Sequence, residues 1–214
     1  MTELWGVLSD VHGNLPALER ALDFCRARGV TRLACLGDVL GDREDEECCR
    51  RLMAEVDVVT FGHREVRVRL SVSDEVRSWL RALPATEVVE GILFCHASPA
   101  SVFPSDIRAE EALQFKRGLN YFKLFPYVSG RAAALCAATA MAGRVELCFH
   151  GHTHNQSIWR VENDKADRVT ESEYTLQSGT YLIDVGSVGK AQGDRIEFAL
   201  YSPAERRVEL LSLG

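Results

Sequence analysis

The sequence predicts an α/β fold in a single domain that spans residues 1–214. Two patterns predict this class. In the first third, short apolar strands alternate with amphipathic helices at the spacing of parallel βαβ units. From Ser157 onward, strand-like segments are separated only by turn-rich pieces, as in an antiparallel sheet. A chain of 214 residues is long enough to bury one large core, and we find no internal repeat, low-complexity tract or interdomain linker.

The first strand and helix have the clearest signals. Leu4–Leu8 is a short apolar run, and Pro16–Arg28 has apolar residues at helical spacing. Gly29 follows this helix at the position where glycine commonly ends one. The next expected elements are a strand at Leu33–Leu36, a helix at Asp45–Ala54 and a strand at Val56–Phe61.

The middle of the chain predicts two helices, and the last third predicts strands. Asp74–Leu83 is a helix that ends before Pro84, and the alanine-rich segment Arg131–Ala142 is helical by propensity. Residues 99–142 hold no strong strand. The expected strands are Glu87–Val89, Ile92–Cys95, Val145–Phe149, Ser157–Glu162, Val169–Leu176, Tyr181–Val185, Ile196–Ser202 and Arg207–Leu211, with turns at Asn163–Ala166 and Gln177–Gly179.

Charge and cysteine usage narrow the partners and the compartment. The formal net charge of −6 argues against nonspecific binding to duplex nucleic acid or to anionic lipid, although bound metal ions would still allow phosphates to bind. The seven cysteines form no C-x-x-C pair and are typical of buried thiols in a reducing cytoplasm. The first residues lack the pattern of a secretory signal, and no run of about 18 apolar residues predicts a membrane span. We therefore expect a soluble cytoplasmic protein.

Polar residues gather directly after five of the apolar strands. These clusters are residues 10–14, 37–42, 62–65, 96–99 and 150–154. All six histidines of the chain fall within them, together with several aspartates. Because ligands of α/β proteins bind at the carboxyl ends of parallel strands, we expect these loops to meet in one site.

The residue types in these clusters suit a pair of metal ions. Mixed aspartate and histidine ligands favour Mn²⁺, Fe or Zn²⁺ over Ca²⁺ or Mg²⁺. Two such ions, roughly 3.5–4 Å apart, would turn a bridging water into a hydroxide that attacks phosphorus and would neutralise the phosphoryl oxygens. Asp38 lies at the centre of the pattern and suits a carboxylate shared by both ions. Asp10 and His12, like His152 and His154, are two residues apart, so an extended segment would point both side chains the same way.

The order of these clusters resembles that of the calcineurin-like metallophosphoesterase superfamily. Matching segments include LSDVHGNLPALERAL, CLGDVLG, FCHASP, FHGHTHN and LIDVGSVGK, which are similar to the small bacterial phosphodiesterase-type branch. The resemblance implies a four-layer α/β/β/α sandwich with two mixed sheets, and a dinuclear-metal hydrolase of phosphate esters. It also implies that one metal is held by Asp10, His12, Asp38 and His154, and the other by Asp38, the residue at 63, His96 and His152.

The third motif departs from the family pattern at two positions. Where the family has Gly-Asn-His-Glu, this chain has Gly62, His63, Arg64 and Glu65. His63 would replace the family's asparagine as a metal ligand, act as a proton donor, or only pack against its neighbours. Arg64 stands where the resemblance implies a leaving-group acid; it grips phosphate oxygens but cannot usefully donate a proton. Losing a general acid costs ~10²–10⁴-fold, so we expect phosphodiesters with good leaving groups, such as aryl esters or phosphoanhydrides.

Four other residues in the clusters have less specific assignments. Asn14 follows the first motif and either contacts substrate or caps the next helix. Glu65 and Asp42 are candidates to orient ligating histidines through hydrogen bonds. His150 lies outside the motif pattern, and we expect a structural role for it.

Two alternatives to a phosphodiesterase stay open at this point. The metal ligands do not choose the substrate, so a phosphoprotein or dinucleoside polyphosphate phosphatase is one alternative. The altered third motif also allows a catalytically weakened scaffold or binding module, as in the retromer scaffold subunit, which resembles this fold. Metal analysis and an assay with nitrophenyl phosphate would separate an enzyme from a module.

Overall fold

The computed structural model describes residues 3–214 except 42, 68–70, 102, 105 and 116–120. Within these residues, two mixed sheets of six strands each form the centre of the molecule. The first sheet has parallel pairing at β1, β2 and β3 and antiparallel pairing in the rest. Its strands, in spatial order, are β3 (Val58–Val59), β2 (Arg32–Cys35), β1 (Trp5–Leu8), β11 (Ile196–Ser202), β12 (Arg207–Leu213) and β9 (Glu173–Thr175).

The second sheet also mixes the two kinds of pairing. Its central strands β5, β6 and β10 are parallel, and the flanking strands pair antiparallel. In spatial order the strands are β4 (Thr86–Val89), β5 (Ile92–Cys95), β6 (Leu147–His150), β10 (Thr180–Asp184), β7 (Ser157–Glu162) and β8 (Lys165–Val169). The parallel strands β1, β2, β3, β5 and β6 come from the part of the sequence that predicted parallel units. The prediction that the chain is antiparallel from Ser157 onward is wrong for β10, which pairs parallel with β6.

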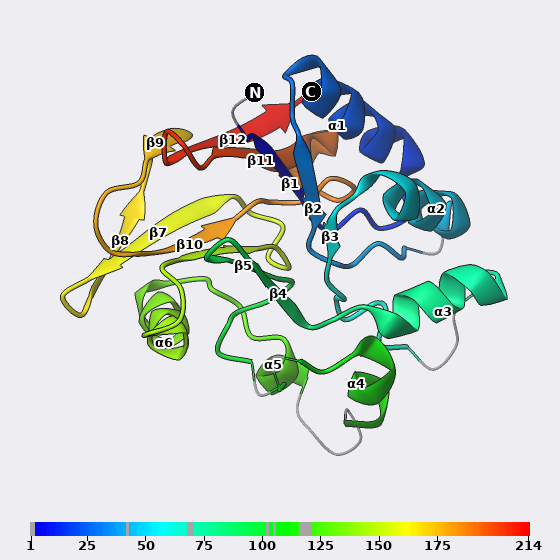
Figure 1. Ribbon diagram of the computed structural model, residues 1–214, viewed down its shortest axis with the longest axis horizontal. Helices are drawn as coiled ribbons and strands as arrows, with labels where there is room; N and C mark the ends of the chain where they lie inside the picture. The colour runs from blue at the N-terminus through cyan, green and yellow to red at the C-terminus, as the bar shows by residue number, and fades with distance from the viewer. Residues whose placement is uncertain (1–2, 42, 68–70, 102, 105, 116–120) are drawn as a thin grey trace.

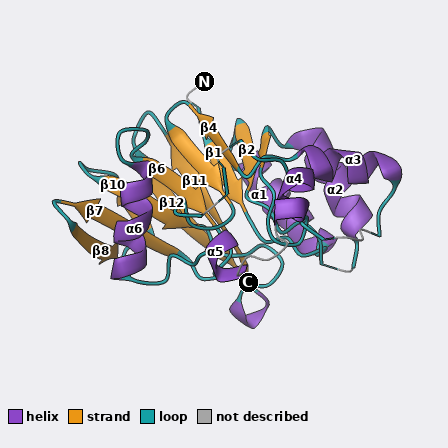
Figure 2. Ribbon diagram, turned by 90° about the horizontal axis from the view of Figure 1, so that it is seen from below, coloured by secondary structure: helices purple, strands orange, loops and turns teal. Residues whose placement is uncertain are grey.

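Helices cover the outer faces of both sheets, which confirms the predicted four-layer α/β/β/α sandwich. On one side lie α1 (Leu15–Ala27) and α2 (Asp45–Glu55), and α6 (Arg131–Met141) lies against the second sheet (Figures 1 and 2). The short helices α3 (Asp74–Ala82) and α4 (Ala109–Phe115) continue the first helical layer, and α5 (Tyr121–Leu124) lies to the left of α4 at the bottom of Figure 1. None of the described helices is both long and apolar enough to cross a bilayer.

Large buried aromatic side chains fill the space between the sheets. Trp5 on β1 and Phe94 on β5 are fully buried, and their ring centroids lie 5.1 Å apart. Phe149 on β6 stacks beside Phe94 at 6.0 Å. Full burial of a side chain of this size stabilises the fold by about 1.5–3 kcal/mol, so this layer fixes the two sheets against each other. The strand ends that carry the polar clusters are thereby held in place.

The strand predicted at Val169–Leu176 is wrong, because two strands in different sheets share this segment. Lys165–Val169 forms β8 beside β7, and the turn predicted at Asn163–Ala166 is shorter, with Asn163 and Asp164 at its corner. Both corner residues have positive φ, as a two-residue hairpin turn requires. Glu173–Thr175 forms β9 at the edge of the other sheet. Only Ala166 is buried in β8, so this strand lacks the apolar alternation that would reveal it.

Candidate metal centre

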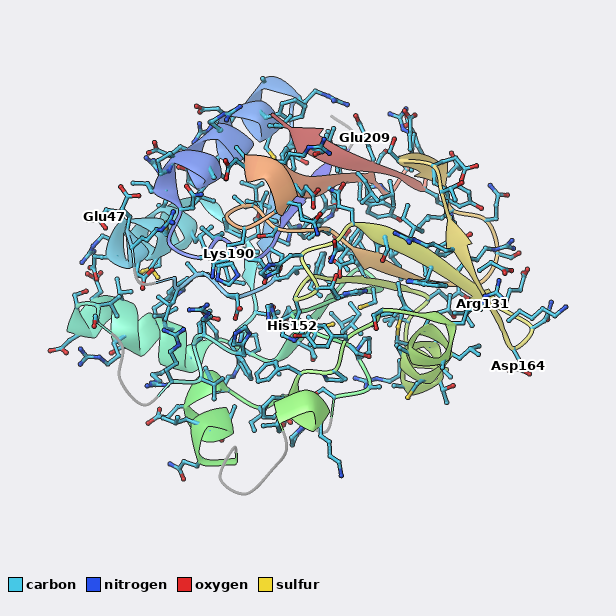
Figure 3. The ribbon with its side chains drawn as sticks, turned by 180° about the vertical axis from the view of Figure 1, so that it is seen from behind. Glu47, Arg131, His152, Asp164, Lys190 and Glu209 are labelled. Atoms are coloured by element: carbon cyan, nitrogen blue, oxygen red, sulfur yellow. The ribbon has the colours of Figure 1, made fainter. Side chains whose placement is uncertain are left out.

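The predicted ligands all lie in loops at the carboxyl ends of β1, β2, β3, β5 and β6. These five strands belong to two different sheets, and their ends face the same side of the sandwich. In Figure 3 the labelled His152 lies near the middle of the molecule, among the loops that leave these strands. The structure therefore brings together the predicted residues Asp10, His12, Asp38, His63, His96, His152 and His154.

A first group that could hold a metal ion consists of Asp10, His12 and His154. The Nε2 atoms of His12 and His154 lie 3.1 Å apart, and His154 Nε2 lies 3.1 Å from Asp10 Oδ1. His12 Nε2 lies 3.6 Å from the same oxygen. All three atoms thus surround one small volume.

A second group consists of His63, His96 and His152. The distance from His96 Nε2 to His152 Nδ1 is 3.1 Å. His96 Nδ1 donates to the main-chain oxygen of Leu36 at 2.8 Å, so Nε2 is the ring atom that faces the second group. Tyr127 stacks on the ring of His152 with centroids 4.4 Å apart and an interplanar angle of 9°, a contact that the sequence did not reveal.

Asp38 lies between the two groups. Its Oδ2 atom is 2.9 Å from His63 Nδ1 and 3.9 Å from His12 Nε2, and its Oδ1 atom is 3.5 Å from His96 Nε2. Together with Asp10 and His96 it forms a third group of metal-binding type. One carboxylate therefore reaches both clusters, as a shared ligand would.

The spacing of these atoms fits a metal-binding site. Ligands bonded at about 2.0–2.2 Å to one ion lie about 2.8–3.6 Å apart, between octahedral and tetrahedral geometry. Most of the distances given above fall in this range. Asp38 Oδ2 is buried and accepts no hydrogen bond of good geometry from the described residues, although His63 Nδ1 is near. A cation would satisfy this oxygen and the lone pairs that converge on it.

Charges within the cluster adjust its protonation for metal binding. Burial raises the pKa of Asp10, but His96 and hydrogen bonds from His12 and His154 outweigh it and hold the pKa well below its usual value. Burial, and then the charge of His96, lower the pKa of His152 to about 3. A deprotonated carboxylate and a neutral imidazole are the forms that bind metal, so little proton release accompanies binding at these two residues.

Two partly exposed ligands mark the open side of the centre. The side chains of His63 and His154 are 26% and 28% exposed, whereas those of Asp10 and Asp38 are completely buried. These two histidines, one from each of the first two groups, therefore form the solvent-exposed side of the cluster.

Five of the seven predicted ligands have left-handed backbone conformations. The φ angles are 55° at Asp10, 51° at His12, 50° at Asp38, 70° at His152 and 56° at His154. The expectation that extended segments point Asp10 and His12, or His152 and His154, the same way is therefore wrong. Tight left-handed turns direct these side chains inward, and residues other than glycine are uncommon in this region of φ and ψ. Such conformations persist because the surrounding hydrogen bonds hold them.

Two glycines allow the ligand loops to approach one another. A Cβ atom on Gly62 would lie 2.3 Å from Asp38 Oδ1, and one on Gly151 would lie 2.0 Å from Ser9 Oγ and 2.5 Å from Asp10 Oδ2. Neither glycine is among those with positive φ, so the requirement here is space. Any side chain at 62 would displace the central carboxylate.

The buried carboxylate of Glu65 organises the Asp38 loop. It accepts hydrogen bonds from the main-chain N–H groups of Asp38, Val39, Leu40 and Gly62 at 3.0, 3.0, 3.2 and 2.7 Å. Burial, followed by the charge of Asp38, raises the pKa of Glu65 to about 7. These hydrogen bonds of Glu65 all go to main-chain amides, so the prediction that it orients ligating histidines is corrected. Asp42, the other residue predicted for that role, lies outside the described residues.

A segment near the end of the chain clamps the Asp10 loop. Ser187 Oγ donates to the main-chain oxygen of Asp10 at 2.8 Å. The N–H groups of Val188 and Gly189 donate to the main-chain oxygens of Ser9 and Asp10 at 2.9 and 3.0 Å. This segment, LIDVGSVGK, stood out in the sequence only by its resemblance to the family, and its contact with the first motif was not predicted.

The remaining predicted residues have mixed outcomes. Asn14 caps α1, because its Oδ1 accepts from Ala17 N at 3.2 Å; its contact with substrate stays a prediction. Arg64 donates its main-chain N–H to Asp38 Oδ1 at 2.9 Å, and its side chain is half-buried beside the centre. His150 belongs to none of the three metal-binding groups among the described residues, and burial lowers its pKa to about 4.

Comparisons with known proteins agree with this geometry. A model of the calcineurin-like phosphoesterase superfamily domain matches residues 4–206. A protein of Methanocaldococcus jannaschii named as uncharacterized is 22% identical over 235 residues, which cover 96% of this chain and 85% of that protein.

Solved structures share the fold at low sequence identity. A metallophosphoesterase from Sphaerobacter thermophilus has a TM-score of 0.74 at 24% identity, covering 100% of this chain and 89% of that chain. An archaeal phosphodiesterase has a TM-score of 0.56 at 13% identity, covering 98% and 99%. A protein serine/threonine phosphatase from Saccharomyces cerevisiae has a TM-score of 0.55 at 11% identity, covering 99% and 80%. The same fold thus occurs in proteins named for different phosphoester substrates.

Proposed function

Because the chain belongs to the calcineurin-like phosphoesterase superfamily, we propose that its aspartate and histidine cluster holds two divalent metal ions and hydrolyses phosphodiesters. Membership in this family makes the chain a metal-dependent phosphoesterase. The observation that carries the finer proposal is the pair of ligand groups joined by Asp38. A single carboxylate reaching both groups is what a dinuclear centre requires.

The ligand sets follow from the groups described above. Asp10, His12, Asp38 and His154 would hold one ion, and Asp38, His63, His96 and His152 the other. When bound, the two ions supply a nucleophile by lowering the pKa of a water and neutralise charge on the phosphoryl group. His63 fits the ligand role best, because its Nδ1 atom lies 2.9 Å from Asp38 Oδ2 and its ring faces His96 and His152. Nitrogen and carboxylate ligands in this mixture suit Mn²⁺, Fe or Zn²⁺.

Arg64 takes the place that would belong to a proton donor. Its N–H anchors it to Asp38, so the side chain starts next to the reacting group. A guanidinium binds two phosphate oxygens at once and stays protonated, so it stabilises charge without giving a proton to the leaving group. We infer that the enzyme favours esters whose leaving groups need no protonation.

The decisive experiment combines metal analysis with a leaving-group series. Purified protein loaded with Mn²⁺, Fe²⁺ or Zn²⁺ should retain two ions per chain and hydrolyse bis(p-nitrophenyl) phosphate much faster than dialkyl phosphates. Arg64→His should raise turnover of the dialkyl substrates by roughly 10-fold or more, because it restores a general acid. Arg131→His, far from His152 in Figure 3, is the matched control and should change nothing. Equal rates for aryl and alkyl esters would refute the role of Arg64.

The same assay separates the alternatives. A phosphoserine peptide and a dinucleoside polyphosphate belong in the substrate series, since the fold is shared with a protein serine/threonine phosphatase. A protein that binds no metal under any loading condition would instead be a scaffold or binding module. The cytoplasmic location and the absence of duplex nucleic acid as a partner stay predictions from charge and cysteine usage.

A further inference from the structure

A groove of about 490 Å³ opens beside His154, next to the proposed metal centre. The loop of the first motif contributes Asn14, and the clamping segment contributes Gly189 and Lys190. The start of α1 and the loops around Arg43 and Arg195 complete its walls. In Figure 3 the labelled Lys190 and His152 both lie in the central, loop-rich part of the molecule. The part of a metal-bound substrate that extends beyond the reacting phosphate would therefore lie next to this groove.

The groove is basic although the chain is acidic. Its described lining includes the side chains of Arg20, Arg43, Lys190 and Arg195, against Asp194 as the one carboxylate. The whole chain has a formal net charge of −6. In addition, α1 has no acidic residue in its first turn, so the positive end of its dipole is not neutralised there. Four cations in one hollow of an acidic protein favour an anionic ligand.

The backbone at Lys190 is fixed relative to the metal ligands. Its main-chain N–H donates to Ser187 Oγ at 2.8 Å, and that hydroxyl donates to the main-chain oxygen of Asp10. Gly189, just before it, packs so closely on Val11 that a Cβ would lie 1.8 Å from the Val11 oxygen. Lys190 is therefore a positioned cation.

Arg43 is held on the other side of the same loop. Its Cβ lies 3.3 Å from the position of a Cβ on Gly13, and the neighbouring Glu44 N–H donates to the Gly13 oxygen at 3.2 Å. Arg20, deeper along α1, donates to the Gly214 oxygen at 2.6 Å, so one of its nitrogens is engaged. Lys190 and Arg43 are thus the two cations that flank the loop carrying His12.

We propose that this groove binds a second phosphate group of the substrate. The preferred substrate is then a phosphoester that carries at least one further phosphate besides the one attacked. This inference rests on the proposed phosphodiesterase function and narrows its substrate class.

The test uses matched substrates that differ only in the distant end. A series of p-nitrophenyl alkyl phosphates is prepared whose alkyl arm, two to six carbons long, ends in either a hydroxyl or a phosphate. The wild-type enzyme should have a KM about 10-fold lower for the best phosphate-ended member, with the same leaving group and a similar kcat. Lys190→Gln and Arg43→Gln should each remove about 3- to 5-fold of that preference, as expected for exposed charge pairs, with a smaller effect on the KM of the hydroxyl-ended substrates. Raising the salt concentration should shrink the preference in the wild type.

Controls separate a local contact from the field of the whole protein. Lys165→Gln removes an exposed lysine beside Asp164, which Figure 3 shows at the far end of the molecule from Lys190, and should keep the full preference. Lys190→Arg, which keeps the positive charge, should retain most of the preference for phosphate-ended substrates. Equal KM values for both ends throughout the series, or a Lys190→Gln effect of the same size on both ends, would overturn the groove assignment while the hydrolase stands. If the metal-loaded protein turned over neither substrate, the proposed function and this inference would both be refuted.

Discussion

Removing the carboxylate of Glu65 should damage the fold and the centre together. Glu65→Gln keeps the shape of the side chain but leaves one oxygen, so two of the four N–H groups described above would face an NH₂. A hydrogen bond to a charged group contributes about 1.5–3 kcal/mol, and a buried donor without a partner costs about 1–3 kcal/mol. Removing a buried charge offsets part of this loss, and we expect a net destabilisation of about 3 kcal/mol.

Thermal denaturation of the metal-free protein above about pH 8, where the carboxyl of Glu65 with its pKa of about 7 is charged, measures this effect. For a chain of this size, 1 kcal/mol corresponds to roughly 2–4 °C, so Glu65→Gln should lower Tm by about 6–12 °C. Metal affinity should fall by about 10–100-fold, because the Asp38 loop loses its anchor. Glu87→Gln, an exposed glutamate on β4, is the matched control and should stay within about 0.5 kcal/mol of the wild type. A Glu65→Gln protein that melts within 2 °C of the wild type and binds metal normally would refute this account of the loop.

Three further predictions follow from the site and the core. A metal concentration of about 100 times Kd should raise Tm by about 5–10 °C, as measured by calorimetry. Asp38→Asn should abolish this rise and lower the metal content found by elemental analysis. Gly62→Ala should destroy metal binding because its Cβ would lie 2.3 Å from Asp38 Oδ1. Gly130→Ala, whose Cβ would have no atom within 4 Å, should leave the metal content unchanged. A Gly62→Ala protein with normal metal content would contradict the steric argument. A colorimetric thiol reagent at neutral pH should react rapidly with one cysteine of the folded chain, the exposed Cys136, because the other six are buried. After denaturation all seven should react. Rapid reaction of more than one cysteine in the folded chain would contradict the described core.

That these aspartates and histidines lie together could be predicted because they recur where strands end. The sequence placed Asp10 after one strand and His96 after another, and general rules for parallel strands bring such ends together. The structure puts them in one group with Asp38. The two mixed sheets and the helices on both outer faces were expected from the resemblance to the family. The apolar run of β1, the apolar periodicity of α1 and the alanine content of α6 predicted only those elements.

Other features depend on tertiary contacts that no local pattern reports. Edge strands such as β8 are mostly solvent-exposed, and their residues follow no apolar alternation. The role of Glu65 depends on main-chain N–H groups, which are the same for every residue type and leave no trace in the sequence. The clamp from Ser187 to Asp10 joins residues 177 positions apart. The LIDVGSVGK segment resembled the family in the sequence, but only the fold shows that it contacts the Asp10 loop.

The left-handed turns at the predicted metal ligands lower the stability of the ion-free protein, although they position the side chains of the centre. Each such residue, other than glycine, costs of order 1 kcal/mol, so the ion-free molecule would gain stability if these turns carried glycine. The side chain of His154 is 28% exposed, so replacing it with glycine loses little packing. At this position the gain in backbone stability would exceed the loss of packing. A mutant library selected only for heat tolerance should therefore accumulate His154→Gly and lose ion binding, whereas a library selected for turnover should keep the histidine.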